Sequence, residues 1–403
     1  MTRVATWVLG CSYAMAWGIV GWLWRGPLTD LDLFFLPAVR IALSGHPLLV
    51  YTVRFQSIIA NDNGPLGLVP LTAVAAIASW LGWDDTRLLR ALVLAAFSVF
   101  TVLMAREAVA AIDRLRGATL TGLSRILAYG VFAASPTLLI SVLGYGHVEQ
   151  PMMLWLVLVA VRTLTRDRPA AAGVSFGLAI LTRTLAALPL IPLGLLLLAR
   201  GRWRALTSLG GIPALIVGLG LLPFLLADPA DTIYSLLTHR GSLAVGGGSI
   251  WQLLVGTPYQ WVPQHADILF VLGLAVLLSL TVIVARKDLE PASRDIYGLL
   301  ALTALTLPLL AKSVWPYYFL DAYVFGAVWW LGQSDPLALG RRLIGAAVPL
   351  IAVVGTLLTE YEMGTNSARI RLAEGVFMGA VLIVLTGVLV ARLRRGALPQ
   401  LTS

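Results

Sequence analysis

The segment 206–226, LTSLGGIPALIVGLGLLPFLL, contains no charged residue and reaches the roughly 20 residues that an α-helix needs to cross the hydrocarbon core of a membrane. Similar apolar runs recur at 4–24, 268–285, 343–358 and 373–390. Of the 403 residues, 59% are hydrophobic and 12% are charged, and the mean hydropathy is +0.87. Soluble domains are only roughly 45–50% apolar. The sequence therefore predicts an all-α, polytopic transmembrane helical bundle and excludes a water-soluble fold.

Basic residues between the apolar runs indicate how the chain threads the membrane, because Lys and Arg collect on the cytoplasmic side. The clusters are Arg106/Arg114/Arg116/Arg125, Arg162/Arg166/Arg168, Arg200/Arg202/Arg204, Arg286/Lys287/Arg294, Arg341/Arg342 and Arg392/Arg394/Arg395. They share one side if the chain crosses about twelve times (roughly 11 to 13), with both termini cytoplasmic. The expected crossings are 4–24, 88–105, 126–142, 151–165, 169–183, 185–199, 205–226, 266–285, 296–311, 315–331, 343–359 and 373–391. The net charge of +9 fits this topology better than nucleic-acid binding, which we do not expect.

This topology leaves two long segments on the outer side, 25–87 and 227–266, and a short one, 144–150. Counting the apolar run 66–81 as a crossing would put the basic 106–125 segment outside, so we expect this run to lie in the outer interface or to re-enter the membrane. The outer segments are rich in Asp, His and amide side chains. We therefore expect one membrane domain, 1–403, with its working face outside the cytoplasm. Abundant Arg, Ala and Gly with only two lysines indicate a GC-rich bacterium, and hence the plasma (inner) membrane.

Asp30 and Asp32 follow the first expected crossing closely, ahead of an amphipathic stretch at 34–44. A carboxylate under apolar cover at the membrane interface is partly desolvated, which raises its proton affinity towards the range of a general base. The structural alternative is that both residues are solvated or cap the following helix, where acidic residues are common. The pair also resembles the acids of a metal site, but no histidine pair with metal-ligand spacing accompanies it.

Two cations occur where a charge is unusual. Arg183 interrupts an otherwise apolar hairpin, and Lys312 lies at the outer end of a crossing. A charge at that depth is a functional candidate suited to a substrate phosphate, although a long cation can simply reach lipid headgroups. Glu149, with His147 and Gln150, follows the third crossing, where capping of the next helix is the structural alternative.

Several classes of function lack their motifs. There is no P-loop, no dinucleotide-binding glycine-rich turn and no Ser/His/Asp hydrolase motif. The single cysteine, Cys11, lies inside the first apolar run, which leaves neither an internal disulfide nor a Cys-based metal site. The first run is too long for a signal peptide and no small-residue cleavage site follows it, so we expect a retained crossing. No internal repeat relates the two halves, which disfavours a secondary transporter.

Short motifs follow one another in a specific order. They are TDLDLF (29–34), AVR (38–40), SGHP (44–47), YTVR (51–54), NGPL (63–66), GHVE (146–149), AG…GLA…R (172–183), HRGS…SIW (239–251) and K…YY (312–318). In this order the chain resembles the C-type (GT-C) polytopic glycosyltransferases that use polyprenyl-phosphate sugars. Within that group it is most similar to the polyprenyl- or dolichyl-phosphate-mannose-dependent mannosyltransferases, such as GPI mannosyltransferase I and its bacterial relatives. Arg183 stands where that family has Lys, and the spacing to Arg40 leaves either acid, Asp30 or Asp32, as the equivalent one.

The resemblance implies an inverting transfer in which Asp30 or Asp32 takes a proton from an acceptor hydroxyl. That hydroxyl, on a lipid, glycan or protein, attacks the anomeric carbon of a polyprenyl-phosphate sugar, mannose in this family. The lipid phosphate then leaves, so no cofactor is required and a divalent metal is not expected. The residues expected to bind the donor phosphate or the substrates are Lys312, Arg183, Arg240, His147, Glu149, Gln150, Tyr317, Tyr318 and Arg54.

Two rival functions remain open. A transporter or lipid-carrier flippase also needs many crossings with buried charges, and charges on both halves of a central cavity would favour it. An envelope-polymer ligase, which moves a whole oligosaccharide, would need a larger outer segment than 227–266. Clustering of the reactive groups on the outer face favours the transferase.

Overall fold

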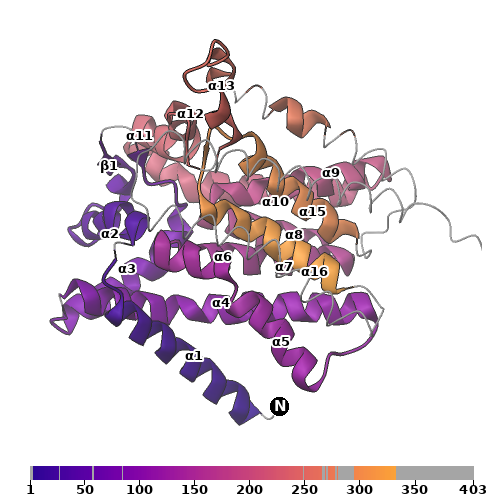
Figure 1. Cartoon of the computed structure of the whole chain (residues 1–403), viewed down its shortest axis with the longest axis horizontal. Helices are drawn as coiled ribbons and strands as arrows, with labels where there is room; N and C mark the ends of the chain where they lie inside the picture. The colour runs from indigo at the N-terminus through magenta and orange to yellow at the C-terminus, as the bar shows by residue number, and fades with distance from the viewer. Residues whose placement is uncertain are drawn as a thin grey trace, which may run out of the picture. The chain divides into compact units, whose positions relative to one another are not determined.

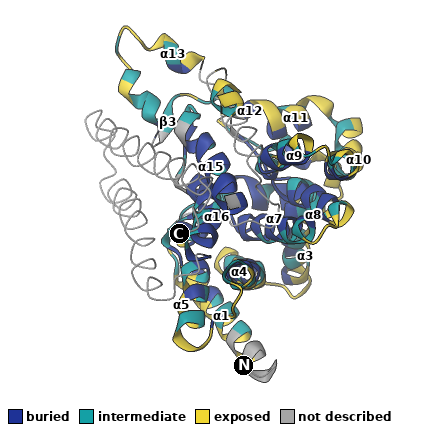
Figure 2. Ribbon diagram, turned by 90° about the vertical axis from the view of Figure 1, so that its right-hand side faces the viewer, coloured by how far each residue is buried: buried dark blue, intermediate teal, exposed yellow. Residues whose placement is uncertain are grey.

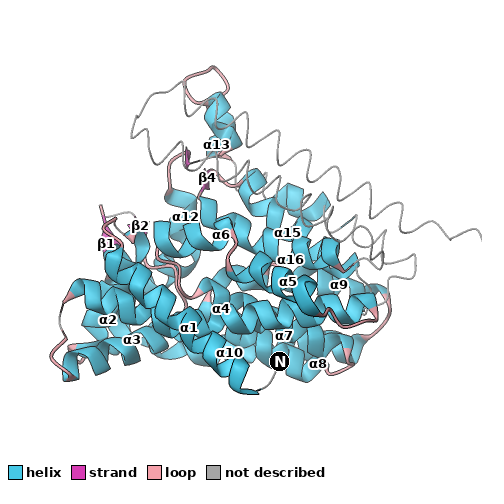
Figure 3. Ribbon diagram, turned by 60° about the horizontal axis from the view of Figure 1, so that its bottom comes forward, coloured by secondary structure: helices cyan, strands magenta, loops and turns pink. Residues whose placement is uncertain are grey.

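The computed structural model of the chain is mostly helical (Figure 3). The structure describes residues 3–26, 28–56, 59–83, 85–247, 249–265, 268, 271–276, 279 and 295–332. The chain divides into two compact units. The first unit is Met1–Ala108, Ala128–Ala187 and Ser208–Ser242, and the second is Val109–Leu127, Leu188–Thr207 and Leu243–Ser403. The acidic pair of the first motif therefore lies in the first unit, and Lys312 lies in the second.

Most of the described helices lie in the first unit. Figure 1 labels the helices and colours them by residue number. In chain order the elements up to residue 187 are α1 (Arg3–Leu23), η1 (Leu31–Phe35), α2 (Leu36–Leu43), η2 (Pro47–Thr52), β1 (Arg54–Phe55), β2 (Ile59–Ala60), α3 (Pro65–Trp80), α4 (Thr86–Arg116), α5 (Gly122–Ala133), α6 (Pro136–Leu139), η3 (Ile140–Gly144), α7 (Gln150–Thr165), α8 (Pro169–Thr182) and η4 (Thr184–Ala187). The elements that follow are α10 (Trp203–Ala227), α11 (Pro229–Ile233), η5 (Tyr234–Thr238) and α12 (His239–Ser242). Helices α4, α5 and α10 extend across the division between the units.

The second unit contains two helices, α15 and α16, that pack along each other. Its elements are α9 (Leu190–Ala199), β3 (Gly246–Gly247), η6 (Ile250–Leu254), α13 (Trp261–Gln264), α15 (Asp295–Leu310), β4 (Ser313–Val314), η7 (Pro316–Tyr318) and α16 (Phe319–Leu331). Strand β3 pairs in parallel with β4, with Gly246 opposite Ser313. The side chains of Ser249 and Trp251 also donate to backbone oxygens at the end of α15, both at 2.9 Å. The glycine-rich part of the outer segment 227–266 is thus tied to the K…YY motif.

The hairpin of α7 and α8 is the core of the first unit. A short turn at 166–168 joins the two helices, and each begins with Pro in its first turn, where the missing N–H costs no helical bond. Figure 2 shows α7 largely buried, whereas α10 carries much more exposed surface. A helix that is apolar on all sides and buried on most of them belongs in the interior of a bundle. The two helices at 150–182 are therefore interior helices of the first unit, shorter than the usual length of a crossing.

Three described helices are long and apolar enough to cross a membrane: Thr86–Arg116, Gly122–Gly144 and Trp203–Ala227. Six shorter apolar helices occur at Pro65–Trp80, Gln150–Thr165, Pro169–Thr182, Thr184–Ala199, Ile296–Pro308 and Phe319–Leu331. Most expected crossings thus coincide with an apolar helix to within a few residues, and the predicted all-α class is confirmed. The expected crossings 343–359 and 373–391, and most of 266–285, lie outside the described residues. The number of crossings and the orientation of the chain stay predictions.

Candidate functional site

Asp30 and Asp32 lie at the start of a helix rather than ahead of it. The expectation that the helical stretch begins only at residue 34 is wrong, because the backbone N–H of Asp32 already donates to Leu28 O at 2.8 Å, a bond of the helical i to i−4 type. Asp30 is the residue before η1, and Asp32 lies inside it. Segment η1 is a π-helical turn, a form found frequently at functional sites.

Asp32 is fully engaged in a structural ion pair. Arg90 of α4 donates from Nε to Oδ1 at 3.0 Å and from Nη2 to Oδ2 at 2.5 Å, which is a two-point contact. The backbone N–H of Leu28 donates to the same Oδ2 at 2.9 Å. Such forked pairs between arginine and carboxylate are strong and directional. Asp32 therefore fastens the start of η1 to α4.

Asp30 instead faces a buried polar cluster. Its Oδ2 lies 2.9 Å from Nε2 of His147, and Nδ1 of His147 lies 2.9 Å from Oε1 of Glu149. Nη1 of Arg183 donates to the same Glu149 oxygen at 3.0 Å and lies 3.1 Å from His147 Nδ1. His147 and Glu149 have no exposed side-chain surface and Arg183 has 1%, whereas Asp30 is 20% exposed. Asp30 is thus the member of this cluster that meets the surroundings.

A glycine allows the loop before α7 to reach Asp30. The carbonyl oxygen of Tyr145 accepts the backbone N–H of Asp30 at 2.8 Å. The next residue, Gly146, has φ +78°, and a Cβ added there would lie 2.5 Å from the Cβ of Leu31. Only glycine meets both conditions without strain. The GHVE motif is therefore built to lie directly against the helix start that bears the acid.

Arg183 is held by the chain that precedes α3. Its backbone is extended after the end of α8 and forms an isolated antiparallel bridge with Asn63. The N–H of Gly64 donates to Thr182 O at 3.1 Å, and a Cβ on Gly64 would lie only 2.0 Å from Leu181 O. The NGPL motif thus supplies the close backbone approach that fixes the position of Arg183.

Charges of both signs set the proton affinity of His147. Its complete burial and the neighbouring Arg183 both lower the pKa of His147, and the carboxylates of Glu149 and Asp30 more than offset them. The net result is a pKa raised above the ordinary value for histidine. With the imidazole protonated, two cations face two carboxylates, and the buried charges compensate one another.

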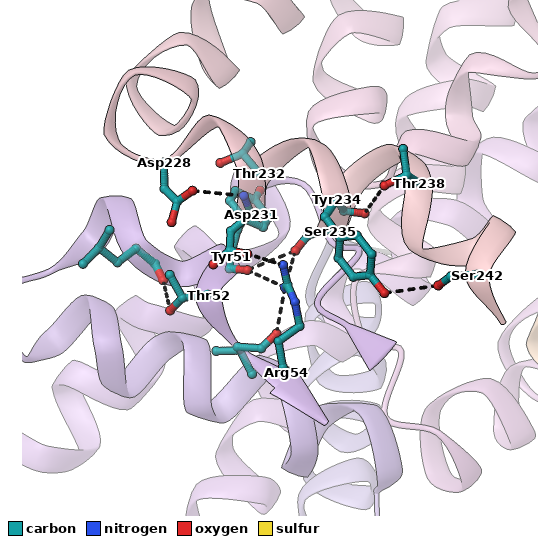
Figure 4. A network of polar contacts seen from close by, with 12 residues as sticks. Tyr51, Thr52, Arg54, Asp228, Asp231, Thr232, Tyr234, Ser235, Thr238 and Ser242 are labelled. Atoms are coloured by element: carbon teal, nitrogen blue, oxygen red, sulfur yellow. Dashed lines mark hydrogen bonds and ion pairs between the residues drawn. The ribbon is translucent and has the colours of Figure 1, made fainter. Parts of the chain in front are cut away.

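Arg54 joins the first outer segment to the segment after α10 (Figure 4). Its guanidinium donates to Asp231 Oδ1 at 2.6 Å, to Ser235 Oγ at 2.8 Å and to the carbonyl oxygen of Tyr51 at 2.7 Å. It also lies 4.6 Å from the ring centroid of Tyr234. These contacts hold two segments together, and the expected role of Arg54 in substrate binding stays a prediction.

No family model and no curated protein matches this chain. Among solved structures, it is similar to ArnT from Cupriavidus metallidurans, a GT-C glycosyltransferase, in the apo state. The identity is 20% and the TM-score is 0.55, over 99% of this chain and 74% of ArnT. The structure of ArnT bound to undecaprenyl phosphate matches over the same shares at 20% identity with a TM-score of 0.50. This chain has the GT-C fold. The fold predicted from the order of the motifs is confirmed. A special closeness to mannosyltransferases stays a prediction.

Two predicted site residues of the first unit of this GT-C chain have other surroundings. Gln150, the first residue of α7, accepts from Ser141 Oγ at 2.6 Å through its Oε1, next to the Asp30 cluster along the chain. Arg240 lies in α12, and its side chain is outside what the structure describes. Donor binding by Gln150 and Arg240 stays a prediction.

Lys312, Tyr317 and Tyr318 lie in the second unit of the GT-C fold. Lys312 is the second residue after α15, and its carbonyl oxygen accepts the N–H of Gly246 at 3.1 Å. The two tyrosines are buried and pack edge to face, with ring centroids 4.7 Å apart. That these three residues act on a lipid phosphate stays a prediction.

Arg90 and Asn63 are not among the site residues predicted from the sequence. Arg90 is a charge inside the expected crossing 88–105, so the rule that singled out Arg183 would also have found Arg90. Asn63 is fully buried, and its side-chain amide has no hydrogen-bonding partner among the described residues. Asn63 is part of the NGPL motif, but the motif does not show this contact, because the position of Asn63 depends on Arg183, far along the chain.

No group of three or more His, Cys, Asp or Glu side chains within the described part of the chain is arranged to hold a metal ion. In that part of the chain Asp30 lies beside His147, and the carboxylate of Glu149 pairs with Arg183. That transfer needs no metal stays a prediction.

Proposed function

We propose that this GT-C chain is a glycosyltransferase that moves a sugar from a polyprenyl-phosphate donor to a hydroxyl of a lipid, glycan or protein acceptor. We propose mannose as the sugar. The observation that carries the proposal is the position of Asp30, a partly exposed carboxylate whose inner oxygen meets the buried cluster of His147, Glu149 and Arg183. A carboxylate with one oxygen held and the other available is suited to act as a general base.

Asp30 is the base in this proposal, and Asp32 is not. Both oxygens of Asp32 are occupied by Arg90, and one of them also accepts a backbone N–H. Among the described residues, none bonds Oδ1 of Asp30, so this oxygen is available to an acceptor hydroxyl. As the acceptor oxygen bonds to the anomeric carbon, its proton passes to Asp30. The bond from that carbon to the phosphate oxygen breaks, and the electron pair leaves with the lipid phosphate.

Cations stabilise the phosphate as its negative charge develops. Lys312 and Arg240 are the proposed direct contacts, since Arg183 is buried and bonded to Glu149. Tyr317, Tyr318 and Gln150 complete the proposed substrate-binding set. The structure of ArnT bound to undecaprenyl phosphate shows that a protein of this fold binds such a carrier. That binding supports a polyprenyl-phosphate donor for the present chain.

We place the site on the outer face of a bacterial plasma membrane, with both termini cytoplasmic. The basic clusters on the opposite side of the expected crossings support this orientation. The donor is a lipid-linked sugar, which the enzyme can take up from within the membrane without a nucleotide.

The test is transfer of radiolabelled sugar from synthetic polyprenyl-phosphate mannose to acceptors extracted from membranes. Asp30→Asn should reduce turnover by roughly 10²–10⁴-fold, the usual contribution of a positioned base, without loss of folded protein. Asp32→Asn should keep most of its turnover per folded molecule, which makes it the matched control. Folded wild type that transfers none of several polyprenyl-phosphate sugars would favour a transporter or flippase.

A further inference from the structure

His147 lies at the centre of the Asp30 cluster and has no surface of its own. Both ring nitrogens are 2.9 Å from a carboxylate oxygen, Nε2 from Asp30 and Nδ1 from Glu149. The ring packs against Phe35, with centroids 5.6 Å apart, and the side chain has no exposed area. No part of the imidazole is therefore available to a sugar or a phosphate.

Proton counting limits what the ring can do. Two acceptor atoms 2.9 Å apart repel, so each of the two nitrogen–oxygen contacts must hold one proton. The cluster then contains either an imidazolium between two carboxylates or a neutral imidazole beside one protonated carboxyl group. The groups that face the ring and bear on this choice are Asp30, Glu149 and Arg183. In both arrangements Oδ2 of Asp30 is held by His147, and none of the described residues bonds its other oxygen.

We infer that His147 is a positioning residue that orients Asp30 for proton abstraction, rather than one of the substrate-binding residues. Its Nε2 makes an ion-pair contact with one carboxylate oxygen of Asp30 at 2.9 Å, and Glu149 and Arg183 contact the ring at Nδ1. The hydrogen bond from the backbone N–H of Asp30 to the carbonyl oxygen of Tyr145, together with the close approach at Gly146, keeps His147 next to Asp30. The inference rests on the proposed function of Asp30.

The role of His147 in the reaction is indirect. The acceptor proton moves to Oδ1 of Asp30 while the bond between sugar and phosphate breaks, and His147 neither gains nor loses a proton to the substrate. After transfer, the proton on Asp30 leaves to solvent on the exposed side of the carboxyl group. A preorganised base of this kind raises turnover without adding affinity for donor or acceptor.

Kinetics separate positioning from binding. In His147→Gln, we expect kcat to fall by about 10–100-fold, as for other groups that orient a reactive residue. The KM for donor and for acceptor should stay within about twofold, because only transition-state interactions are lost. Deprotonation of His147 at alkaline pH would weaken its contact with Asp30, so kcat of the wild type should fall there, and this fall should be absent in the same variant. A raised KM for the donor with unchanged kcat would overturn the inference in favour of substrate binding.

A second measurement needs no turnover. The chain has four histidines, so histidine labelled with ¹⁵N gives few signals, and the His147 signal is the one missing in His147→Gln. In Asp30→Asn the titration midpoint of His147 should fall, whereas in Asp32→Asn it should stay within about 0.2 of wild type, because Asp32 bonds Arg90 instead. An unchanged midpoint in Asp30→Asn would overturn this inference alone. If the wild type transfers no sugar but the His147 midpoint still falls in Asp30→Asn, only the proposed function would be overturned.

If His147→Gln does not fold, Glu149→Gln provides the same test from the other side of the ring. It keeps the shape of the side chain and removes the charge that Nδ1 meets. Positioning predicts a reduced kcat with an unchanged KM and a lowered midpoint for His147. A normal kcat in folded Glu149→Gln, with the midpoint unchanged, would contradict it.

Discussion

The guanidinium of Arg90 donates two hydrogen bonds to the carboxylate of Asp32, from Nε to Oδ1 at 3.0 Å and from Nη2 to Oδ2 at 2.5 Å. The two side chains are 16% and 18% exposed, so the pair is intermediate between a surface ion pair and a buried one. The two aspartates therefore have different surroundings. Asp32 anchors η1 to α4 through Arg90, whereas one oxygen of Asp30 is bonded by none of the described residues.

Replacing Arg90 should therefore act on stability. We expect Arg90→Leu to lower the free energy of unfolding by about 1–3 kcal/mol, since Asp32 would lose its charged partner. Thermal unfolding of the detergent-solubilised protein measures the change. Arg87→Leu, on the exposed side of the same helix, is the control and should stay within about 0.5 kcal/mol. Equal effects of the two changes would show that the ion pair contributes little.

The pair of Glu149 and Arg183 should show strong coupling. Both side chains are buried and bonded, so removing only one leaves a buried charge uncompensated. Arg183→Met alone should cost roughly 3–5 kcal/mol. In a double-mutant cycle, Glu149→Gln with Arg183→Met should cost less than the sum of the two single changes. Additive costs would mean that the two charges do not depend on each other.

Gly146→Ala tests the close approach of the histidine loop. The substitution adds the strain of a positive φ, about 1–2 kcal/mol, and a clash with Leu31. Gly45→Ala is the matched control, because Gly45 also has a positive φ of 94° but nothing lies within 4 Å of the added Cβ. We expect a clearly larger drop in unfolding temperature for Gly146→Ala. Similar decreases in unfolding temperature for the two variants would show that residues near Gly146 can move to accommodate the methyl group and that the contact with Leu31 adds little strain.

The raised pKa of His147 predicts a pH dependence of stability. A group whose pKa is higher in the folded protein stabilises the fold below its unfolded value, about 6.5, and that contribution is lost as the pH rises through the folded value. The stability advantage of wild type over His147→Gln should therefore be greatest in mild acid and shrink towards alkaline pH. Unfolding temperatures of both proteins at a series of pH values measure it. An advantage that grows with pH would mean that the ring is neutral in the folded state.

Much of the site was accessible from the sequence, because each motif marks one part of it. Asp30, His147, Glu149 and Arg183 were all candidates, and the structure brings the four together. The choice between Asp30 and Asp32 was not accessible. Residues two apart on a helix point in directions about 200° apart, so the pair meets different neighbours. Which aspartate meets which neighbour depends on packing against distant segments.

Other features arise from long-range contacts that leave no local pattern. The bridge between Asn63 and Arg183 and the parallel pairing of Gly246 with Ser313 each join segments far apart in the chain. Hydropathy located most of the helices well, because an apolar run of the right length has few alternatives in a membrane. It contains no information about which loops meet.

The contact between Arg54 and Asp231 can form only late in the synthesis of the chain. The two residues are 177 positions apart, so the ribosome makes Arg54 long before its partner exists. At about 5–20 residues per second, the wait is roughly 9–35 s. Throughout that interval the segment that contains Arg54 lacks the contact that fastens it to the residues after α10. The nascent chain therefore lacks this link between its two segments until α10 and the residues beyond it have been made.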